Sequence, residues 1–155
     1  MELLIVTGMS GAGKSQAANA LEDMGYYCVD NIPPAIIPSF VELSARSGDL
    51  LNKMAIVTDI RGGVLFSEIE QVLNNLKNNS VAYKILFLDA ADDVLIRRYK
   101  ENRRRHPMAD AENMSLSAAV KKEREMLKKI RFMSDYIIDT SHISCLLYTS
   151  DAADE

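Results

Sequence analysis

The fold is decided at the start of the chain, by Leu3-Leu4-Ile5-Val6-Thr7 and, directly after it, Gly8-Met9-Ser10-Gly11-Ala12-Gly13-Lys14-Ser15. The first stretch is an apolar run, which is typical of a strand buried on both faces. The second matches the Walker A pattern in full, and the residues from Lys14 to about Met24 have the apolar spacing of a helix. A strand, a glycine-rich turn and a helix therefore follow one another in the order that this motif requires.

These eight residues supply the groups that hold a phosphate chain. The glycines allow a tight turn that aims successive amide N–H groups at phosphate oxygens, and the helix N-terminus adds partial positive charge. Lys14 is placed to reach the β- and γ-phosphates, and the Ser15 hydroxyl to ligate Mg²⁺. We therefore expect residues 8–15 to bind nucleotide, with Lys14 as a catalytic residue and Ser15 as a metal ligand.

Beyond the motif, strands and helices alternate along the chain. Further strands are predicted at residues 26–29, 54–58, 83–88 and 136–138, and further helices at 34–47, 64–77, from about 92, and at 117–133. This alternation is typical of βαβ units. We predict an α/β fold of the P-loop NTPase, kinase-like type: a three-layer sandwich around a five-stranded, mainly parallel sheet. The domain is expected to span residues 1–144, and residues 145–155, which have no clear period, are expected to be a truncation or read-through tail.

Three aspartates end predicted strands, and one of them is expected to direct Mg²⁺. Such a Walker B carboxylate lies at the end of a strand beside the motif and meets the metal through Ser15 or water. Asp59 and Asp89 both qualify, and either could instead cap a helix or a turn. Asp59 is favoured as the catalytic and metal-binding carboxylate because Asp59-Ile60-Arg61-Gly62 adds an arginine for phosphate and exposed backbone at glycine. Asp30, on the same edge, could face a phosphoryl acceptor.

A basic segment extends from Arg97 to Arg131. It holds twelve basic and five acidic residues, although the whole chain carries a formal charge of −4. Its first arginines, which follow the fourth predicted strand, are Arg97, Arg98, Arg103, Arg104 and Arg105. In P-loop kinases, arginines at this place close over the transferred phosphoryl group, so we assign Arg97 and Arg98 to the nucleotide site. An RNA-binding surface and two solvated helix faces remain alternatives for the segment.

The composition excludes several other classes of protein. With 48% hydrophobic and 26% charged residues, the chain has the balance of a soluble globular domain. No apolar run approaches the roughly 20 residues of a membrane span, and the first residues do not have the pattern of a signal peptide. Cys28 and Cys145 form no paired motif, which excludes a disulfide framework and a four-thiolate zinc site and favours a reducing cytoplasm.

Several motifs together resemble one family. Besides the Walker A motif, they are Asp30-Asn31-Ile32-Pro33, Asp59-Ile60-Arg61-Gly62, Phe87-Leu88-Asp89-Ala90 and Leu95-Ile96-Arg97-Arg98-Tyr99-Lys100-Glu101-Asn102-Arg103-Arg104-Arg105-His106-Pro107. On these residues, the sequence from about Met1 to Ser144 is similar to the RapZ/YvcJ family of P-loop nucleotide-binding proteins, one branch of which serves as RNase adapters for small RNAs. The resemblance implies binding of ATP and GTP, with weak Mg²⁺-dependent hydrolysis, at residues 8–15 and 59–62.

The same resemblance implies a regulatory role and larger partners. Family members carry a second domain of similar size, and RNA or a ribonuclease would be contacted through that domain. We do not expect this second domain in the present sequence. Two alternatives to regulatory nucleotide binding remain. A small-molecule P-loop kinase would use Asp30 to orient its acceptor. An RNA-binding adapter is supported only by the basic segment, because aromatic residues total 6%. No base-reading element is recognisable, so the expectation of both ATP and GTP comes from the resemblance alone.

Overall fold

The computed structural model describes residues 2–30, 33–46, 53–58, 63–101 and 115–142. The strands are β1 (Glu2–Gly8), β2 (Tyr27–Val29), β3 (Lys53–Val57), β4 (Tyr83–Asp89) and β5 (Tyr136–Asp139). The helices are α1 (Lys14–Asp23), α2 (Ile37–Arg46), α3 (Gly63–Asn78), α4 (Asp92–Glu101) and α6 (Leu116–Met133), with a 3₁₀ turn, η1 (Pro34–Ile36), before α2. Each of these elements lies where the sequence predicts one.

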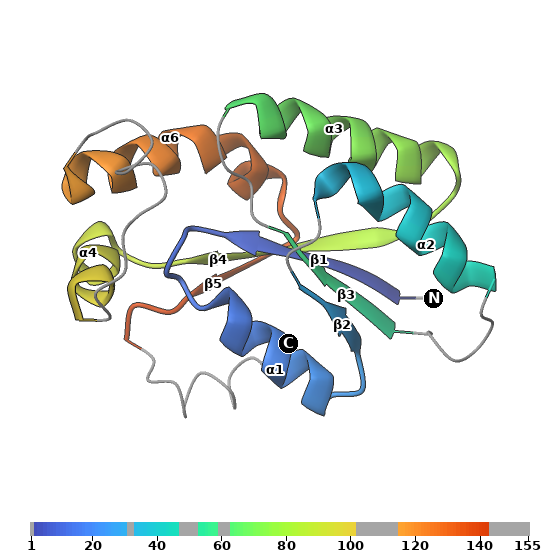
Figure 1. The fold of residues 1–155 in the computed structure, drawn as a ribbon, viewed down its shortest axis with the longest axis horizontal. Helices are drawn as coiled ribbons and strands as arrows, with labels where there is room; N and C mark the ends of the chain where they lie inside the picture. Colours follow the sequence, from blue (N-terminus) through green and yellow to red (C-terminus); the bar gives the residue numbers. More distant parts are fainter. Residues whose placement is uncertain (1, 31–32, 47–52, 59–62, 102–114, 143–155) are drawn as a thin grey trace.

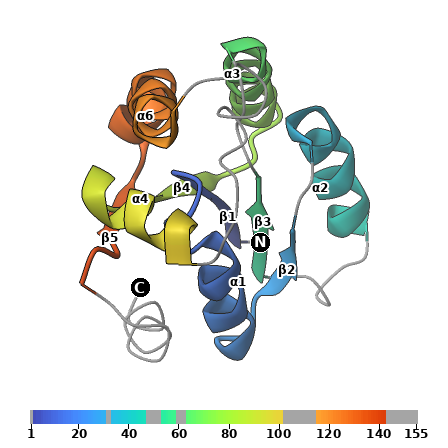
Figure 2. The same cartoon turned by 60° about the vertical axis from the view of Figure 1, so that its left-hand side comes forward.

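The strands form one parallel sheet in the order β2-β3-β1-β4-β5. Helices α3 and α6 lie over one face of this sheet and α1 lies on the opposite face, as the two views in Figures 1 and 2 show. This arrangement confirms the predicted three-layer α/β sandwich. Strand order reverses at β1, because β3 pairs with one of its edges and β4 with the other. Open α/β sheets bind ligands at the carboxyl ends of the strands beside such a reversal.

A closely packed core fixes the position of the loop that follows β1. After Glu2, every residue of β1 is buried, as its apolar sequence predicts for a strand covered on both faces. The buried face of α1 consists mostly of small side chains: Ala17, Ala18, Ala20 and Leu21. Small residues let a helix lie close to a sheet, so the loop between β1 and α1 is held at both ends by rigid elements.

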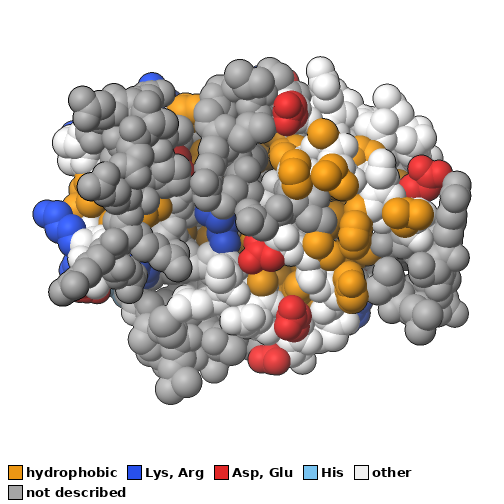
Figure 3. All heavy atoms as spheres, viewed as in Figure 1, with side chains coloured by type: hydrophobic (Ala, Val, Ile, Leu, Met, Phe, Trp, Pro, Cys, Tyr) orange, Lys and Arg blue, Asp and Glu red, His pale blue; other side chains and the backbone are white. Residues whose placement is uncertain are grey.

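Part of the surface is apolar. Hydrophobic side chains are visible over α2 in Figure 3. The exposed hydrophobic residues include Ile36 of η1, at 50%, and Leu43 of α2, at 63%. In the part of the chain that the structure describes, no helix combines the length and the apolar character needed to cross a membrane.

Candidate phosphate-binding site

The loop between β1 and α1 turns through glycines that no other residue could replace without strain. A Cβ atom on Gly8 would lie 2.2 Å from the carbonyl oxygen of Leu88, so this position must be glycine for β1 and β4 to approach each other. Gly11 has a φ of +85°, and Gly13, the residue that precedes α1, has a φ of +106°. Both values lie in the left-handed region that favours glycine. The glycine spacing of the motif therefore follows from the shape of the turn.

The loop offers open hydrogen-bond donors at its C-terminal half. Among the described residues, the amide N–H groups of Gly11, Gly13 and Ser15 have no acceptor. Helix α1 begins at Lys14 with no side-chain cap, so the partial positive charge of its N-terminus is not compensated there by a capping side chain. Open amides at an uncapped helix N-terminus form an anion-binding arrangement, which is the fit that a phosphate group requires.

Lys14 lies folded over the same loop. Its Nζ atom donates hydrogen bonds to the carbonyl oxygens of Gly8, at 3.1 Å, and of Met9, at 3.2 Å. The ammonium group therefore lies beside the loop whose amides are open, where it would add a full positive charge to the site. This position suits the phosphate-binding role that the sequence predicts for Lys14.

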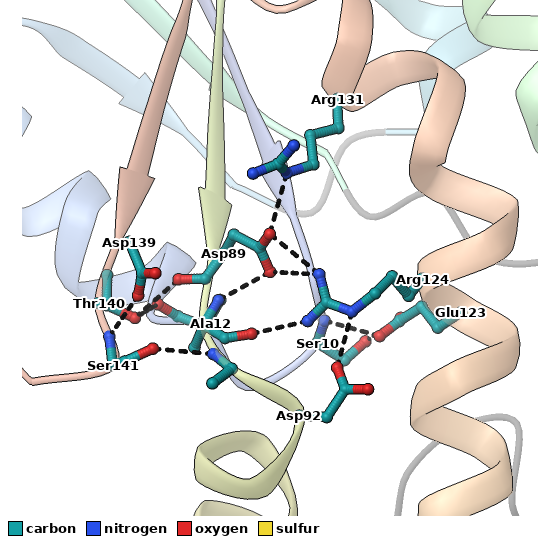
Figure 4. A network of polar contacts seen from close by, with 12 residues as sticks. Ser10, Ala12, Asp89, Asp92, Glu123, Arg124, Arg131, Asp139, Thr140 and Ser141 are labelled. Carbon is teal, nitrogen blue, oxygen red and sulfur yellow. Dashed lines mark hydrogen bonds and ion pairs between the residues drawn. The ribbon is translucent and has the colours of Figure 1, made fainter.

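Neighbouring strands hold the backbone of the loop. The amide of Met9 donates to the carbonyl oxygen of Leu88 in β4, at 3.0 Å. At the end of β5, the hydroxyl of Thr140 donates to the carbonyl oxygen of Ala12 at 2.8 Å (Figure 4). The amide N–H of Thr140 donates to the carbonyl oxygen of Asp89, also at 2.8 Å. These bonds join the loop to β4 and β5, so the carboxyl ends of these two strands support the loop from one side.

The two assigned arginines of α4 lie in different environments. Arg98 donates through Nη1 to the carbonyl oxygen of Gly11, at 3.1 Å, and to the Oγ1 atom of Thr140, at 3.0 Å. It also donates through Nη2 to the carbonyl oxygen of Thr140. Arg97 instead has a side chain that is 61% exposed, with its Nε atom 3.9 Å from Glu101 Oε1. The structure therefore brings Arg98 to the loop and not Arg97, while Arg103, Arg104 and Arg105 lie outside the described residues.

Glu123 of α6 is part of the site, and sequence reasoning missed it. Its side chain is only 3% exposed, and its carboxylate accepts two hydrogen bonds from Ser10: the amide N–H at 3.0 Å and the hydroxyl at 2.6 Å (Figure 4). A signal was present in the sequence, because Glu123 lies on the buried face of α6 with the apolar residues Ala119, Val120, Leu127 and Ile130. A charged residue on such a face needs a buried partner.

Asp89 is fully engaged in a different network. This carboxylate is 6% exposed and accepts hydrogen bonds from the amide of Ala90 at 2.8 Å, from Arg124 Nη1 at 2.9 and 3.0 Å, and from Arg131 Nε at 3.0 Å (Figure 4). Burial lowers the pKa of Arg124, but its bonds to Asp92 and Asp89 outweigh that effect and raise the pKa above its usual value. Asp89 therefore joins β4 to α6, and its oxygens are occupied by cations of the protein.

Of the other two predicted carboxylates, Asp30 lies within the described residues and Asp59 lies outside them. Asp30 is exposed directly after β2, which is the edge strand and is separated from β1 by β3. Residues 59–62, which include the favoured Walker B aspartate, lie outside the described residues. Within the described ranges, no cluster of three or more His, Cys, Asp or Glu side chains could hold a metal by itself. A Mg²⁺ ion at this loop would be held through Ser15, and phosphate oxygens and water are common further ligands of this ion.

Comparison with known sequences identifies relatives along most of the chain. A family model described as the RapZ-like N-terminal domain matches residues 1–150. A nucleotide-binding protein of Caldicellulosiruptor saccharolyticus is 51% identical over 144 residues, which are 93% of this chain and 49% of the relative. A nucleotide-binding protein of Finegoldia magna is 50% identical over 144 residues, with 93% and 50% covered. The chain thus spans about half the length of the curated relatives it matches.

Comparison with solved structures identifies the fold. A shikimate kinase from Acinetobacter baumannii superposes with a TM-score of 0.61 at 16% identity, covering 96% of this chain and 89% of the kinase. The tunicamycin resistance protein of Deinococcus radiodurans has a TM-score of 0.65 at 15% identity, with 99% and 94% covered. At these identities, the likeness shows a shared P-loop kinase-like fold and nothing further.

Proposed function

Because the chain belongs to the RapZ-like N-terminal domain family, we propose that it binds ATP and GTP at residues 8–15 and hydrolyses them slowly with Mg²⁺. The observation that carries this proposal is the row of open amides at Gly11, Gly13 and Ser15, at an uncapped helix N-terminus beside the ammonium group of Lys14. These donors match the oxygens of a phosphate chain and have no other acceptor among the described residues.

The proposal gives each residue of the loop a role. The ammonium group of Lys14 contacts the β- and γ-phosphates as a point charge, in place of or in addition to its hydrogen bonds to the loop carbonyls. Ser15, which is exposed at the start of α1, is the metal ligand from the loop. The engagement of Asp89 by two arginines supports Asp59 as the carboxylate that directs the metal, with Asp59-Ile60-Arg61-Gly62 as the second half of the nucleotide site.

Mg²⁺ would neutralise charge that develops on the phosphate oxygens during hydrolysis. The chain itself supplies the orientation of the triphosphate, through the open amides, and a rigid frame, through the bonds from Met9 and Thr140 to the sheet.

Isothermal titration calorimetry with ATP and GTP, each with and without Mg²⁺, tests the proposal directly. We expect both triphosphates to bind with one site per chain, and a phosphate-release assay to show slow turnover that stops when the metal is chelated. Absence of binding by either triphosphate to the folded protein would contradict the proposal.

The two adjacent arginines of α4 give a prediction with a built-in control. We expect Arg98→Ala to lower turnover about tenfold, roughly 1.4 kcal/mol of transition-state stabilisation, because it removes the contact to Gly11 and Thr140 at the edge of the loop. Arg97→Ala removes the same charge from an exposed side chain and should leave turnover within about twofold of the wild-type rate. Equal effects of the two substitutions on the phosphate-release rate would contradict this difference.

A regulatory role in the cytoplasm, with RNA or a ribonuclease as partner, is proposed for the longer proteins of the family. The chain spans about half the length of the relatives that it matches, so these partners are tested with a full-length relative rather than with this domain. A salt-dependent RNA gel shift on both proteins separates RNA binding by the basic segment from binding elsewhere.

A small-molecule kinase is the second candidate function. The exposed position of Asp30, on the carboxyl edge of the same sheet as the phosphate-binding loop, favours it. Nucleotide turnover measured with and without a panel of hydroxylated acceptors distinguishes the two functions, because only a kinase would be stimulated by an acceptor and transfer phosphate to it.

A further inference from the structure

The clearest feature that the proposed function does not use is the buried contact between α6 and the phosphate-binding loop. Glu123 and Ser10 are 113 residues apart in sequence, and the two carboxylate oxygens each accept one bond from Ser10, at 3.0 and 2.6 Å. A two-point contact of this kind fixes both the position and the orientation of the residue that it holds. Because it engages the backbone amide as well as the side chain, it restrains the loop itself.

We propose that Glu123 is a positioning residue of the nucleotide site, which holds the loop in its phosphate-binding shape through Ser10 before any nucleotide arrives. This inference rests on the proposed function, because it assigns a purpose to the loop that binds nucleotide. Glu123 does not contact the phosphates in this proposal. It acts through Ser10.

The loop has a physical need for such a restraint. Gly8, Gly11 and Gly13 give it more conformational freedom than any other residues would, and ordering glycine backbone is entropically costly. If the loop became ordered only on binding, the free-energy cost of ordering it would weaken the affinity for nucleotide. Met9 and Ala12 are held by the sheet, and Glu123 holds Ser10 between them, so the described bonds restrain three of the four residues from Met9 to Ala12.

Helix α6 is a suitable platform for this contact. It is capped by Ser115, whose hydroxyl accepts the amide of Ala118 at 3.2 Å, and it is anchored in the core by Leu127 and Ile130. The next residue, Arg124, binds the end of β4 through Asp89 and through the carbonyl oxygen of Ala90, at 2.7 Å. The same turn of α6 therefore holds both the loop and the strand end beside it.

The geometry also indicates which property of Glu123 matters. A negative charge near an anion site opposes phosphate binding, so the charge itself is unfavourable for the function. The useful property is the pair of acceptors, which satisfies two donors of Ser10. A glutamine can accept the amide N–H through its oxygen and donate its own N–H to the Ser10 hydroxyl. Glutamine should therefore replace glutamate here, whereas alanine should not.

The test compares four variants by titration calorimetry with ATP and Mg²⁺, at a temperature where each is folded. We expect Glu123→Ala to weaken binding about tenfold or more, and Glu123→Gln to stay within about threefold of wild type or bind more tightly. Glu125→Ala, which removes an exposed glutamate from the same helix, is the matched control and should not change the affinity. Ser10→Ala keeps the amide contact and should lie between Glu123→Ala and wild type.

A second measurement does not depend on nucleotide. Hydrogen exchange of the peptide that covers residues 8–15, in the protein without nucleotide, should become faster in Glu123→Ala but not in Glu123→Gln or Glu125→Ala. If the wild-type protein binds no triphosphate, the proposed function fails, and exchange still decides whether Glu123 orders the loop. Unchanged exchange in Glu123→Ala, or equal loss of binding in the alanine and glutamine variants, would overturn the inference. If Glu123→Ala does not fold, Ser10→Ala and Glu123→Gln decide it by the same two measurements.

Discussion

Replacing Lys14 with alanine is expected to weaken the binding of ATP and GTP by about 100-fold, which corresponds to roughly 2.7 kcal/mol. The reason is that Lys14 supplies a full positive charge beside the open amides of the loop, where its Nζ atom lies 3.1 Å from the carbonyl oxygen of Gly8. A charge-assisted bond to phosphate is stronger than the bonds to loop carbonyls that it replaces. Titration calorimetry with each triphosphate measures the loss.

Nucleotides that carry three, two or one phosphate groups test this prediction further. Because Lys14 is expected to contact the β- and γ-phosphates, Lys14→Ala should affect triphosphates most, diphosphates less and monophosphates little. Lys77→Ala, which removes an exposed charge from the last turn of α3, is the matched control and should leave all three affinities unchanged. Wild-type affinity for triphosphates in a folded Lys14→Ala variant would show that the nucleotide site lies elsewhere.

Two aspartate substitutions should separate metal-dependent chemistry from structural support. We expect Asp59→Asn to lower Mg²⁺-dependent turnover by about tenfold or more with a smaller effect on binding, since the metal carries much of the transition-state charge. Asp89→Asn should instead destabilise the fold by about 1–3 kcal/mol, because Arg124 and Arg131 lose the charge that they share. Its turnover per folded molecule should stay close to that of the wild type.

Phosphate release and urea unfolding, measured on both variants, distinguish these outcomes. The assignment of the metal-directing role to Asp59 is wrong if Asp89→Asn slows hydrolysis while Asp59→Asn does not. A loss of stability in Asp59→Asn without loss of turnover would point to the same conclusion, because that is the behaviour of a carboxylate with a purely structural role.

The sequence alone is sufficient to predict the fold and the glycine-rich loop between β1 and α1, because both are specified by local patterns. The apolar run before Gly8 has the composition of a strand buried on both faces, and the observed β1 is buried from Leu3 onward. The φ values of Gly11 and Gly13 explain why glycine recurs in the motif. Alternating strand and helix patterns lead to a parallel sheet, since such connections have few other solutions.

What surrounds the loop depends on contacts that local patterns do not encode. Asp59 and Asp89 both follow predicted strands, and the sequence favours Asp59 only through the residues that come after it. The packing of α6 against β4 shows that Asp89 is engaged by arginines. Arg97 and Arg98 are adjacent in the chain, yet helical geometry directs only Arg98 to the loop.

Glu123 illustrates the same limit most clearly. Its position on an apolar helix face indicates that a buried partner must exist, but nothing in the sequence identifies Ser10, which lies 113 residues away. The strand, the loop and the helix that follows are thus determined by the sequence through local propensity and hydrophobic period. The partners of buried charges are decided by the tertiary structure, because the cost of burial requires a partner without specifying which residue provides it.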